Sequence, residues 1–277
     1  MSLETRWTTR HDSDLKIEGG NRPLSSQLEV SKVIQYLRER EKEEGGFSFA
    51  VNLYPDIEDT YYAIRTLQML RVEVDRDKTA SYLKSLDWMW VGFPKAIYML
   101  VYLHFSLNIE FPPPLSELLK RDWARFSIID AQYHSDAIQK LIHQPLKPPV
   151  SLSHFQFHRQ ENLQGLRKKV SVLLNHGINF ERQEIIRWVQ LCQNGDGGFG
   201  FYPGTTSYVE NIFCALEILS KLGASPLRID ICREYILGCQ TKSGGFGRAP
   251  ISFPFIESTF QAVAGLFMLE EMERGNT

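Results

Sequence analysis

A repeated unit centred on Gly-Gly-Phe constrains the fold of this chain more than any other feature. The segments "EEGGFSF", "GDGGFGF" and "KSGGFGR" are each followed by a loop and then by a similar helix start: "DIEDTYYAIRTL", "YVENIFCALEIL" and "FIESTFQAVAGL". In each unit the same offset of thirteen positions separates the first glycine from a glutamate: Gly45 to Glu58, Gly197 to Glu210 and Gly244 to Glu257. Self-similarity of this kind is typical of proteins built from stacked structural repeats.

Helical hairpins are predicted along most of the chain. The last two units lie 47 residues apart (Phe199 to Phe246), whereas 152 residues separate Phe47 from Phe199, which leaves room for two degenerate units. Helical patterns cover about 78–86, 95–107, 116–126, 129–143 and 160–175, and no segment shows strand alternation. We therefore predict an all-α fold, an α/α toroid of about six helical hairpins in two concentric layers.

The 277 residues divide into two predicted regions. Residues 1–25 are a polar N-terminal arm without the apolar core of a signal peptide, and residues 26–277 form a single toroid domain with degenerate middle repeats. A proline-rich stretch near 144–158 is predicted to be an exposed loop. The apolar run 96–107 is too short to span a membrane, but its sequence suits either a buried core or contact with a bilayer.

Charge and cysteine spacing narrow the classes of partner. The formal net charge of −2 gives no general attraction to nucleic acid. Four cysteines, Cys192, Cys214, Cys232 and Cys239, lack metal-binding spacing and are expected to be reduced core thiols. We expect a cytoplasmic protein without a nucleic-acid partner, and peripheral contact with a membrane stays open as an alternative.

Two of the units resemble a known family. "WVQLCQNGDGGFGF" and "YILGCQTKSGGFGR" have glutamine, a short turn and Gly-Gly-Phe-Gly, as in the repeat of prenyltransferases and squalene oxidases. The resemblance covers most of the chain from about 26 to 272. It implies an α/α toroid with a central, aromatic-lined cavity for an isoprenoid. The family includes β subunits of protein prenyltransferases and terpenoid cyclases that act by protonation.

The resemblance also allows a test for zinc. Zinc ligands of protein prenyltransferases would fall on Glu210, Ile212 and Ser258 of this chain, and isoleucine and serine cannot replace thiolate and imidazole. The sequence therefore predicts no metal and no cofactor. An α-subunit-like protein partner cannot be inferred from it.

The acidic stretch "DIED" resembles the Asp-x-Asp-Asp motif of terpenoid cyclases that act by protonation. The resemblance implies Glu58 as the proton donor, with Asp56 and Asp59 as flanking carboxylates that tune it. Neighbouring carboxylates can retain a proton because like charges disfavour full ionisation. The alternative is architectural: Asp56 caps a helix, Asp59 completes the cap, and Glu58 occupies a repeated position.

Aromatic side chains near the predicted inner-helix starts could stabilise a carbocation with their ring faces. Two arginines could hold a diphosphate, although a solvated surface position is expected of both of them. The predicted substrate-binding residues are Tyr61, Tyr62, Tyr98, Tyr208, Phe213, Phe255, Phe260, Arg65 and Arg248.

These features support one leading function and two alternatives. The leading hypothesis is a terpenoid-cyclase-like enzyme that protonates an apolar polyprenyl substrate. The alternatives are a noncatalytic toroid that binds an isoprenoid or a protein, and a divergent β-like chain of a protein prenyltransferase without the usual zinc site.

Overall fold

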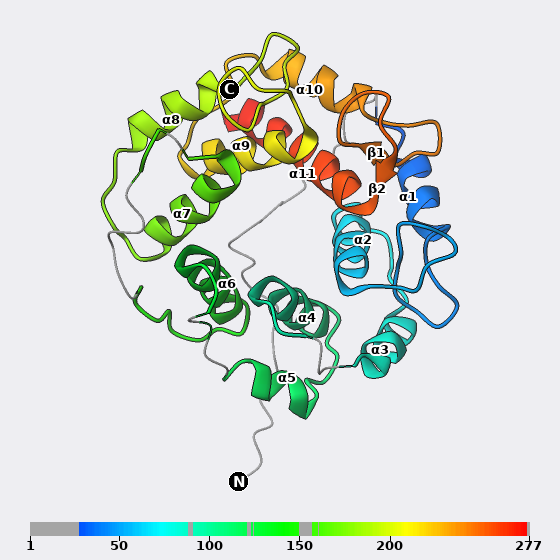
Figure 1. Ribbon diagram of the computed structural model, residues 1–277. Helices are drawn as coiled ribbons and strands as arrows, with labels where there is room; N and C mark the ends of the chain where they lie inside the picture. The colour runs from blue at the N-terminus through cyan, green and yellow to red at the C-terminus, as the bar shows by residue number, and fades with distance from the viewer. Residues whose placement is uncertain are drawn as a thin grey trace.

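The chain closes into a ring of helices in two layers (Figure 1). The computed structural model describes residues 28–87, 91–120, 123, 125–149, 157–159 and 161–275. The inner layer consists of α2 (Ile57–Met69), α4 (Pro94–Ser106), α6 (Ile128–Leu141), α7 (Leu163–Asn175), α9 (Val209–Lys221) and α11 (Ile256–Gly275). The outer layer consists of α1 (Val30–Arg38), α3 (Arg76–Ser85), α5 (Pro113–Leu118), α8 (Arg182–Leu191) and α10 (Ile229–Gly238).

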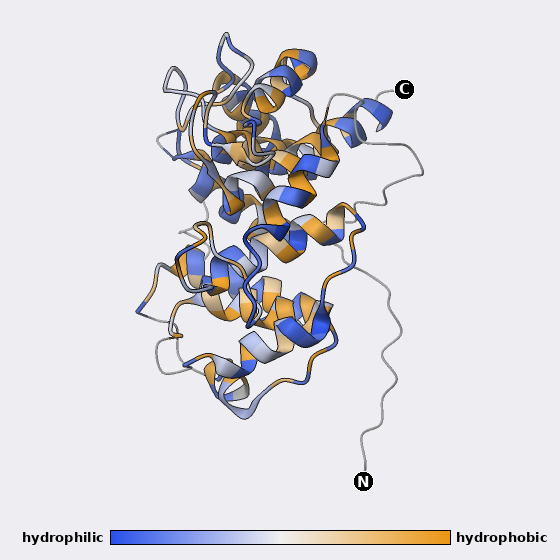
Figure 2. Cartoon of the chain, turned by 90° about the vertical axis from the view of Figure 1, so that its right-hand side faces the viewer, coloured by the Kyte–Doolittle hydropathy of each residue, from blue (hydrophilic) through white to orange (hydrophobic). Residues whose placement is uncertain are grey.

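The inner helices contact one another in a closed order. Each inner helix packs on the next along the chain, from α2 through α4, α6, α7 and α9 to α11, and α11 packs back on α2. This last contact closes the ring, so the predicted all-α toroid is confirmed. Seen from the side, loops with apolar as well as polar residues project from one face, at the left in Figure 2.

One of the six hairpins is incomplete. Between α6 and α7 none of the described residues is helical, so this inner helix has no outer partner in that part of the chain. Residues 144–149 of the proline-rich stretch are mostly exposed, as predicted, whereas 150–156 and the arm at 1–25 lie outside the described residues. Helix α5 begins earlier than predicted and ends at Leu118, because Pro113 and Pro114 suit the first turn of a helix.

Each Gly-Gly-Phe loop packs against the next outer helix around the ring. The phenylalanines Phe47, Phe199 and Phe246 are fully buried. Gly244 has φ +95°, and a Cβ there would lie 2.2 Å from the carbonyl oxygen of Lys32 in α1. Gly45 and Gly197 approach the backbones of α3 and α10 in the same way. The glycines are therefore required both by backbone conformation and by close helix approach.

Three further features concern the repeated glutamines, a short strand pair and the apolar run 96–107. Gln193 and Gln240 donate to the loop carbonyls of Gly197 and Gly244, as expected. A short antiparallel pair, β1 (Phe246–Gly247) and β2 (Pro254–Phe255), was not predicted, because two residues are too few to show alternation. Helix α4 buries most of the apolar run 96–107, so this run belongs to the core. Among the described residues no helix is long and apolar enough to cross a membrane.

Candidate functional site

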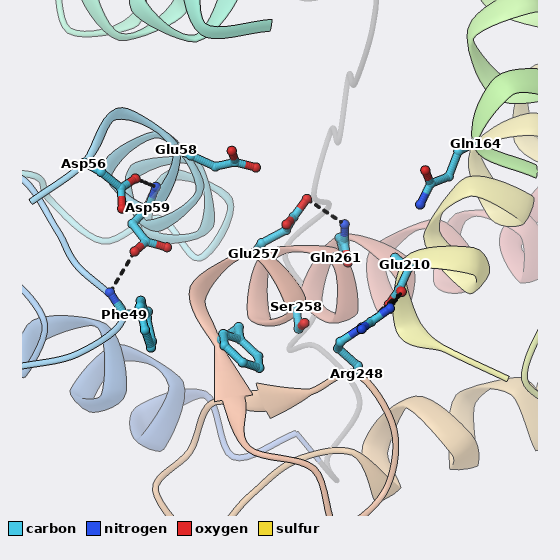
Figure 3. A pocket seen from close by; sticks show the side chains of 11 residues that line it. Phe49, Asp56, Glu58, Asp59, Gln164, Glu210, Arg248, Glu257, Ser258 and Gln261 are labelled. Carbon is cyan, nitrogen blue, oxygen red and sulfur yellow. Dashed lines mark hydrogen bonds and ion pairs between the residues drawn. The ribbon is translucent and has the colours of Figure 1, made fainter. Parts of the chain in front are cut away.

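The second residues of four inner helices point into one end of the ring. Glu58, Gln164, Glu210 and Glu257 hold this position in α2, α7, α9 and α11, and all four line a pocket of about 560 Å³ (Figure 3). The remaining lining residues are Phe49, Asp56, Asp59, Arg248, Phe255, Ser258 and Gln261. The repeat thus places three equivalent glutamates around one opening, which we call the mouth of the ring.

Asp56 and Asp59 are bound to the backbone at the start of α2. Asp56 is the N-cap and accepts a hydrogen bond from the Asp59 N–H at 2.8 Å. Asp59 accepts one from the Phe49 N–H at 2.7 Å. Burial raises the pKa of the Asp59 carboxyl to about 7, and the nearby Asp56 charge adds to the shift, whereas the Phe49 N–H opposes it. Asp59 is therefore a carboxyl group that exchanges its proton near neutral pH.

Glu58 and Glu257 share a cation from the neighbouring helix. Lys95, the second residue of α4, forms an ion pair with Glu58, and its Nζ lies 4.0 Å from Glu257 Oε1. Glu257 also accepts hydrogen bonds from the Tyr62 hydroxyl at 2.9 Å and from the Gln261 amide at 3.2 Å. Burial raises the pKa of Glu257, and Lys95 opposes this shift. Glu58 is thus held as half of an ion pair, which needs its ionised form.

The third glutamate has its own cation. Arg248 Nε donates to the two carboxylate oxygens of Glu210 at 3.1 and 3.3 Å. The Arg248 guanidinium carbon lies 4.8 Å from the ring centroid of Tyr208. Tyr208 therefore supports Arg248 without lining the pocket itself.

One turn deeper, aromatic side chains surround the ring axis. Ring centroids lie 5.1 Å apart for Tyr61–Tyr62 and Tyr62–Phe260, 5.7 Å for Phe260–Phe213, 5.9 Å for Tyr61–Tyr98, 6.2 Å for Tyr98–His134 and 5.1 Å for His134–Tyr133. Arg167 of α7 closes the circuit, because its guanidinium lies 5.1 Å from the Tyr133 ring and 5.8 Å from the Phe213 ring. We call these eight residues the aromatic band. Every inner helix contributes to it.

Two arginines lie in the interior rather than on the surface. Arg167 donates to Glu217 at 2.8 Å and to the Tyr133 hydroxyl at 2.9 Å. Arg65 donates to the Tyr61 hydroxyl at 2.7 Å, and its guanidinium lies 5.0 Å from the rings of both Tyr102 and Phe260. The surface position considered for Arg65 is therefore wrong, because an arginine at the ninth position of an inner helix faces the ring axis.

A comparison with protein families now places the chain. Its sequence matches the prenyltransferase alpha-alpha toroid domain over residues 19–95 and 136–277. The chain belongs to this family. The fold and the suspected kinship with prenyltransferase- and terpenoid-cyclase-like proteins are thus confirmed, whereas a search of curated proteins finds no match.

The zinc site of some toroid enzymes does not fit the residues of this toroid. Ile212 is apolar and buried, and Glu210 is bound to Arg248, which leaves Ser258 as the third position. Within the described residues no group of three or more His, Cys, Asp or Glu side chains could hold a metal ion. The four cysteines are free and buried, and burial raises the pKa of Cys192, Cys232 and Cys239 to about 12. They are core residues, as expected.

All predicted site residues except Tyr208, which lies in neither place, fall into two groups in this toroid. Asp56, Glu58, Asp59, Phe255 and Arg248 line the mouth. The aromatic band contains Tyr61, Tyr62, Tyr98, Phe213 and Phe260, and Arg65 lies against it.

Sequence reasoning missed several residues of both groups. These are Lys95, Gln164, Gln261, Tyr133, His134 and Arg167. Aligning all six inner helices by their first residue, rather than only the three with intact repeats, would have placed most of them on the inner face.

Proposed function

We propose that this toroid is a terpenoid-cyclase-like enzyme that binds an apolar polyprenyl chain against the aromatic band and starts cyclisation by protonating it from Asp59. The observation that carries the proposal is a carboxyl group with a pKa raised to about 7 at the mouth of an aromatic-lined ring. Such a group is partly protonated at neutral pH and can act as a general acid.

The aromatic band supports the choice of ligand. Tyr98, Tyr133 and Phe213 of this band are only partly buried, so solvent or a ligand can reach part of each ring. Their ring faces could contact an apolar chain and stabilise a positive charge that moves along it. An anionic ligand would gain less from these ring faces than an isoprenoid does.

The choice of Asp59 differs from the motif-based expectation. By resemblance the donor would be Glu58, but an ion pair with Lys95 needs the ionised carboxylate. No cation that contacts Asp59 is found in the described part of the chain, and burial favours its neutral form. We therefore assign the acid to Asp59, with Asp56 as the neighbouring charge that keeps the proton bound.

The proposed step needs no further reactant. The Asp59 carboxyl transfers its proton to one carbon of an alkene, whose π electrons form the new C–H bond, and the other carbon becomes a carbocation. Internal alkenes then attack this cation to close rings. Loss of a proton to water ends the reaction, and Asp59 regains a proton from solvent through the open mouth.

A second candidate is an isoprenoid-binding toroid without chemistry. Asp56 caps α2 and Asp59 bonds the loop at Phe49, and both bonds serve architecture even without catalysis. In this case the carboxylates stabilise the loop, and the aromatic band alone determines what binds.

The deciding experiment is incubation of the purified protein with polyprenyl substrates of several lengths, with and without a diphosphate, followed by mass spectrometry. The test variant is Asp59→Asn. The matched control is Asp196→Asn, because Asp196 also accepts a backbone N–H of a Gly-Gly-Phe loop, at 2.9 Å, but lies outside the pocket. We expect cyclised product from the wild type and the control and a loss of about a thousandfold in rate for Asp59→Asn.

The outcomes separate the two candidates. If the wild type forms no product but substrates quench or shift Tyr fluorescence, the toroid binds without chemistry. If Asp59→Asn retains activity while Glu58→Gln loses it, the acid is Glu58. Neither product nor binding would exclude both candidates.

A further inference from the structure

Exposed apolar side chains gather around the mouth of the ring. Of the ten large apolar side chains that are exposed in the described part of the chain, eight lie in the three loops 49–55, 91–95 and 248–255. Two of the eight, Phe49 and Phe255, line the pocket itself. The other six, which we call the apolar rim, are Val51, Leu53, Tyr54, Phe93, Ile251 and Phe253.

The three loops are neighbours in space. They precede α2, α4 and α11, which are consecutive around the ring. The Phe49 and Phe255 rings lie 5.8 Å apart and join the first loop to the third. The ion pair from Lys95 to Glu58 joins the second loop to the start of α2. The rim therefore borders one opening and does not consist of scattered surface residues.

Three of the six rim residues gain little stability from burial. Tyr54 is 89% exposed and Phe253 is 86% exposed, so neither gains much from burial. Ile251 is fully exposed and has φ +68°. A β-branched residue is strained in this left-handed region, where asparagine or glycine would be favoured. An exposed, strained isoleucine at a loop tip suggests a role in contact with another surface.

The charged residues of the three loops indicate what kind of surface the rim contacts. The three loops contain Lys95 and Arg248 but no Asp or Glu. Of the pocket carboxylates, Glu58 and Glu210 are paired with those two cations. Apolar and aromatic side chains on separate loop tips that carry no Asp or Glu suit insertion between lipid headgroups.

We propose that the apolar rim docks on the surface of a lipid bilayer, so that the mouth of the ring faces the membrane. Val51, Leu53, Tyr54, Phe93, Ile251 and Phe253 insert at the level of the headgroups, and the helices stay outside the bilayer. An apolar ligand then passes from the membrane into the ring without crossing water. The partner is the lipid surface itself, and docking does not depend on the identity of that ligand.

The test is co-sedimentation of the full chain with vesicles of phosphatidylcholine and with vesicles that also contain phosphatidylglycerol, without isoprenoid. The test variant combines Tyr54→Ser, Ile251→Asn and Phe253→Ser. The control combines Leu191→Ser and Leu227→Ser, which are 63% and 65% exposed but lie outside the rim. We expect partitioning to fall at least about a hundredfold in the rim variant and to stay unchanged in the control.

Thermal unfolding and light scattering complete the test. The rim variant should unfold at or above the wild-type temperature, because Asn relieves the strain at position 251. Equal partitioning of wild type and rim variant, or no binding of the wild type, would overturn the proposal. A dimer in solution that the rim variant dissociates would overturn it too, since the rim would then be a self-association surface. Vesicle binding without turnover would leave the membrane role intact and count only against the proposed chemistry.

Discussion

The pKa of a carboxyl group is shifted in opposite directions at the mouth and in the interior of the ring. At the mouth, burial and the nearby Asp56 charge together raise the pKa of Asp59 to about 7. In the interior, burial also acts to raise the pKa of Glu217, but Arg167 and Lys221 outweigh it and lower the value to about 2. Burial alone therefore does not decide whether a carboxyl group is charged. The position of cations decides it.

Because of this difference in pKa, the mouth and the interior of the ring have separate roles. Glu217 bonds Arg167 and Lys221 at 2.8 Å each and links α7 with α9, so its charge is fixed at any physiological pH. Among the described residues, Asp59 accepts a hydrogen bond from the Phe49 N–H and lies near the carboxyl groups of Asp56 and Glu58. The interior thus holds permanent charges that brace the helices, and the mouth holds a proton that can leave.

Breaking the interior pair should have the largest effect on stability. In Glu217→Gln, Arg167 loses its carboxylate partner while it stays inside the ring. We expect the free energy of unfolding in urea to fall by about 3 kcal/mol, as for other buried ion pairs that lose one partner. Glu117→Gln is the control, because its pair with Lys120 is largely exposed and should contribute less than about 0.5 kcal/mol. Equal effects of the two variants would contradict the bracing role.

The pH dependence of stability should sharpen the comparison. The raised pKa of Asp59 stabilises the fold fully below its unfolded value near 3.8, and this contribution is lost as pH rises through about 7. The lowered pKa of Glu217 stabilises the fold above about 4.5, and that contribution is lost as pH falls toward about 2. The full shift corresponds to about 4 kcal/mol, and solvent screening of this partly exposed carboxyl group reduces the gain expected for Asp59→Asn relative to wild type between pH 4 and pH 8 to about 2 kcal/mol. Denaturant titrations at several pH values measure it, and a difference independent of pH would show that Asp59 is not perturbed.

Removing the shared cation at the mouth should have the smallest effect. Lys95→Gln leaves Glu58 and Glu257 without their common partner, but the side chains of Lys95 and Glu58 are each 45% exposed. Solvent screens such pairs, so we expect a loss of about 0.5–1 kcal/mol. A double-mutant cycle with Glu58→Gln measures the coupling, and Lys120→Gln provides the surface control. A loss above about 2 kcal/mol would mean that the mouth behaves like the interior.

The sequence carried enough information to predict the fold. The offset of thirteen residues from the first glycine of the Gly-Gly-Phe loop to the glutamate fixes both the loop and the start of the inner helix, and it survives in three units. The count of six hairpins followed from the spacing between units. The spacing did not predict that the described residues between α6 and α7 include no outer helix, because the proline-rich stretch keeps no repeat position.

The site was less accessible to sequence reasoning. Lys95 belongs to a degenerate unit, so no repeat position identified it as the partner of Glu58. Arg65 was placed at the surface because arginine is usually solvated, yet the ring axis offers it three aromatic faces. The raised pKa of Asp59 depends on how far the cations lie from it. These distances follow only from the folded ring.

The contact between α2 and α11 also bears on how the protein is made. The bond from Tyr62 to Glu257 joins positions 195 residues apart, and it lies on the seam that closes the ring. During synthesis the side of α2 that contacts α11 stays uncovered until α11 has been made, whereas neighbouring helices such as α2 and α4 can already pack. Long-range contacts of this kind slow folding and leave apolar surface exposed in the meantime. The nascent chain is therefore an open arc until its last helix emerges, and this is the stage at which aggregation or a chaperone would compete with ring closure.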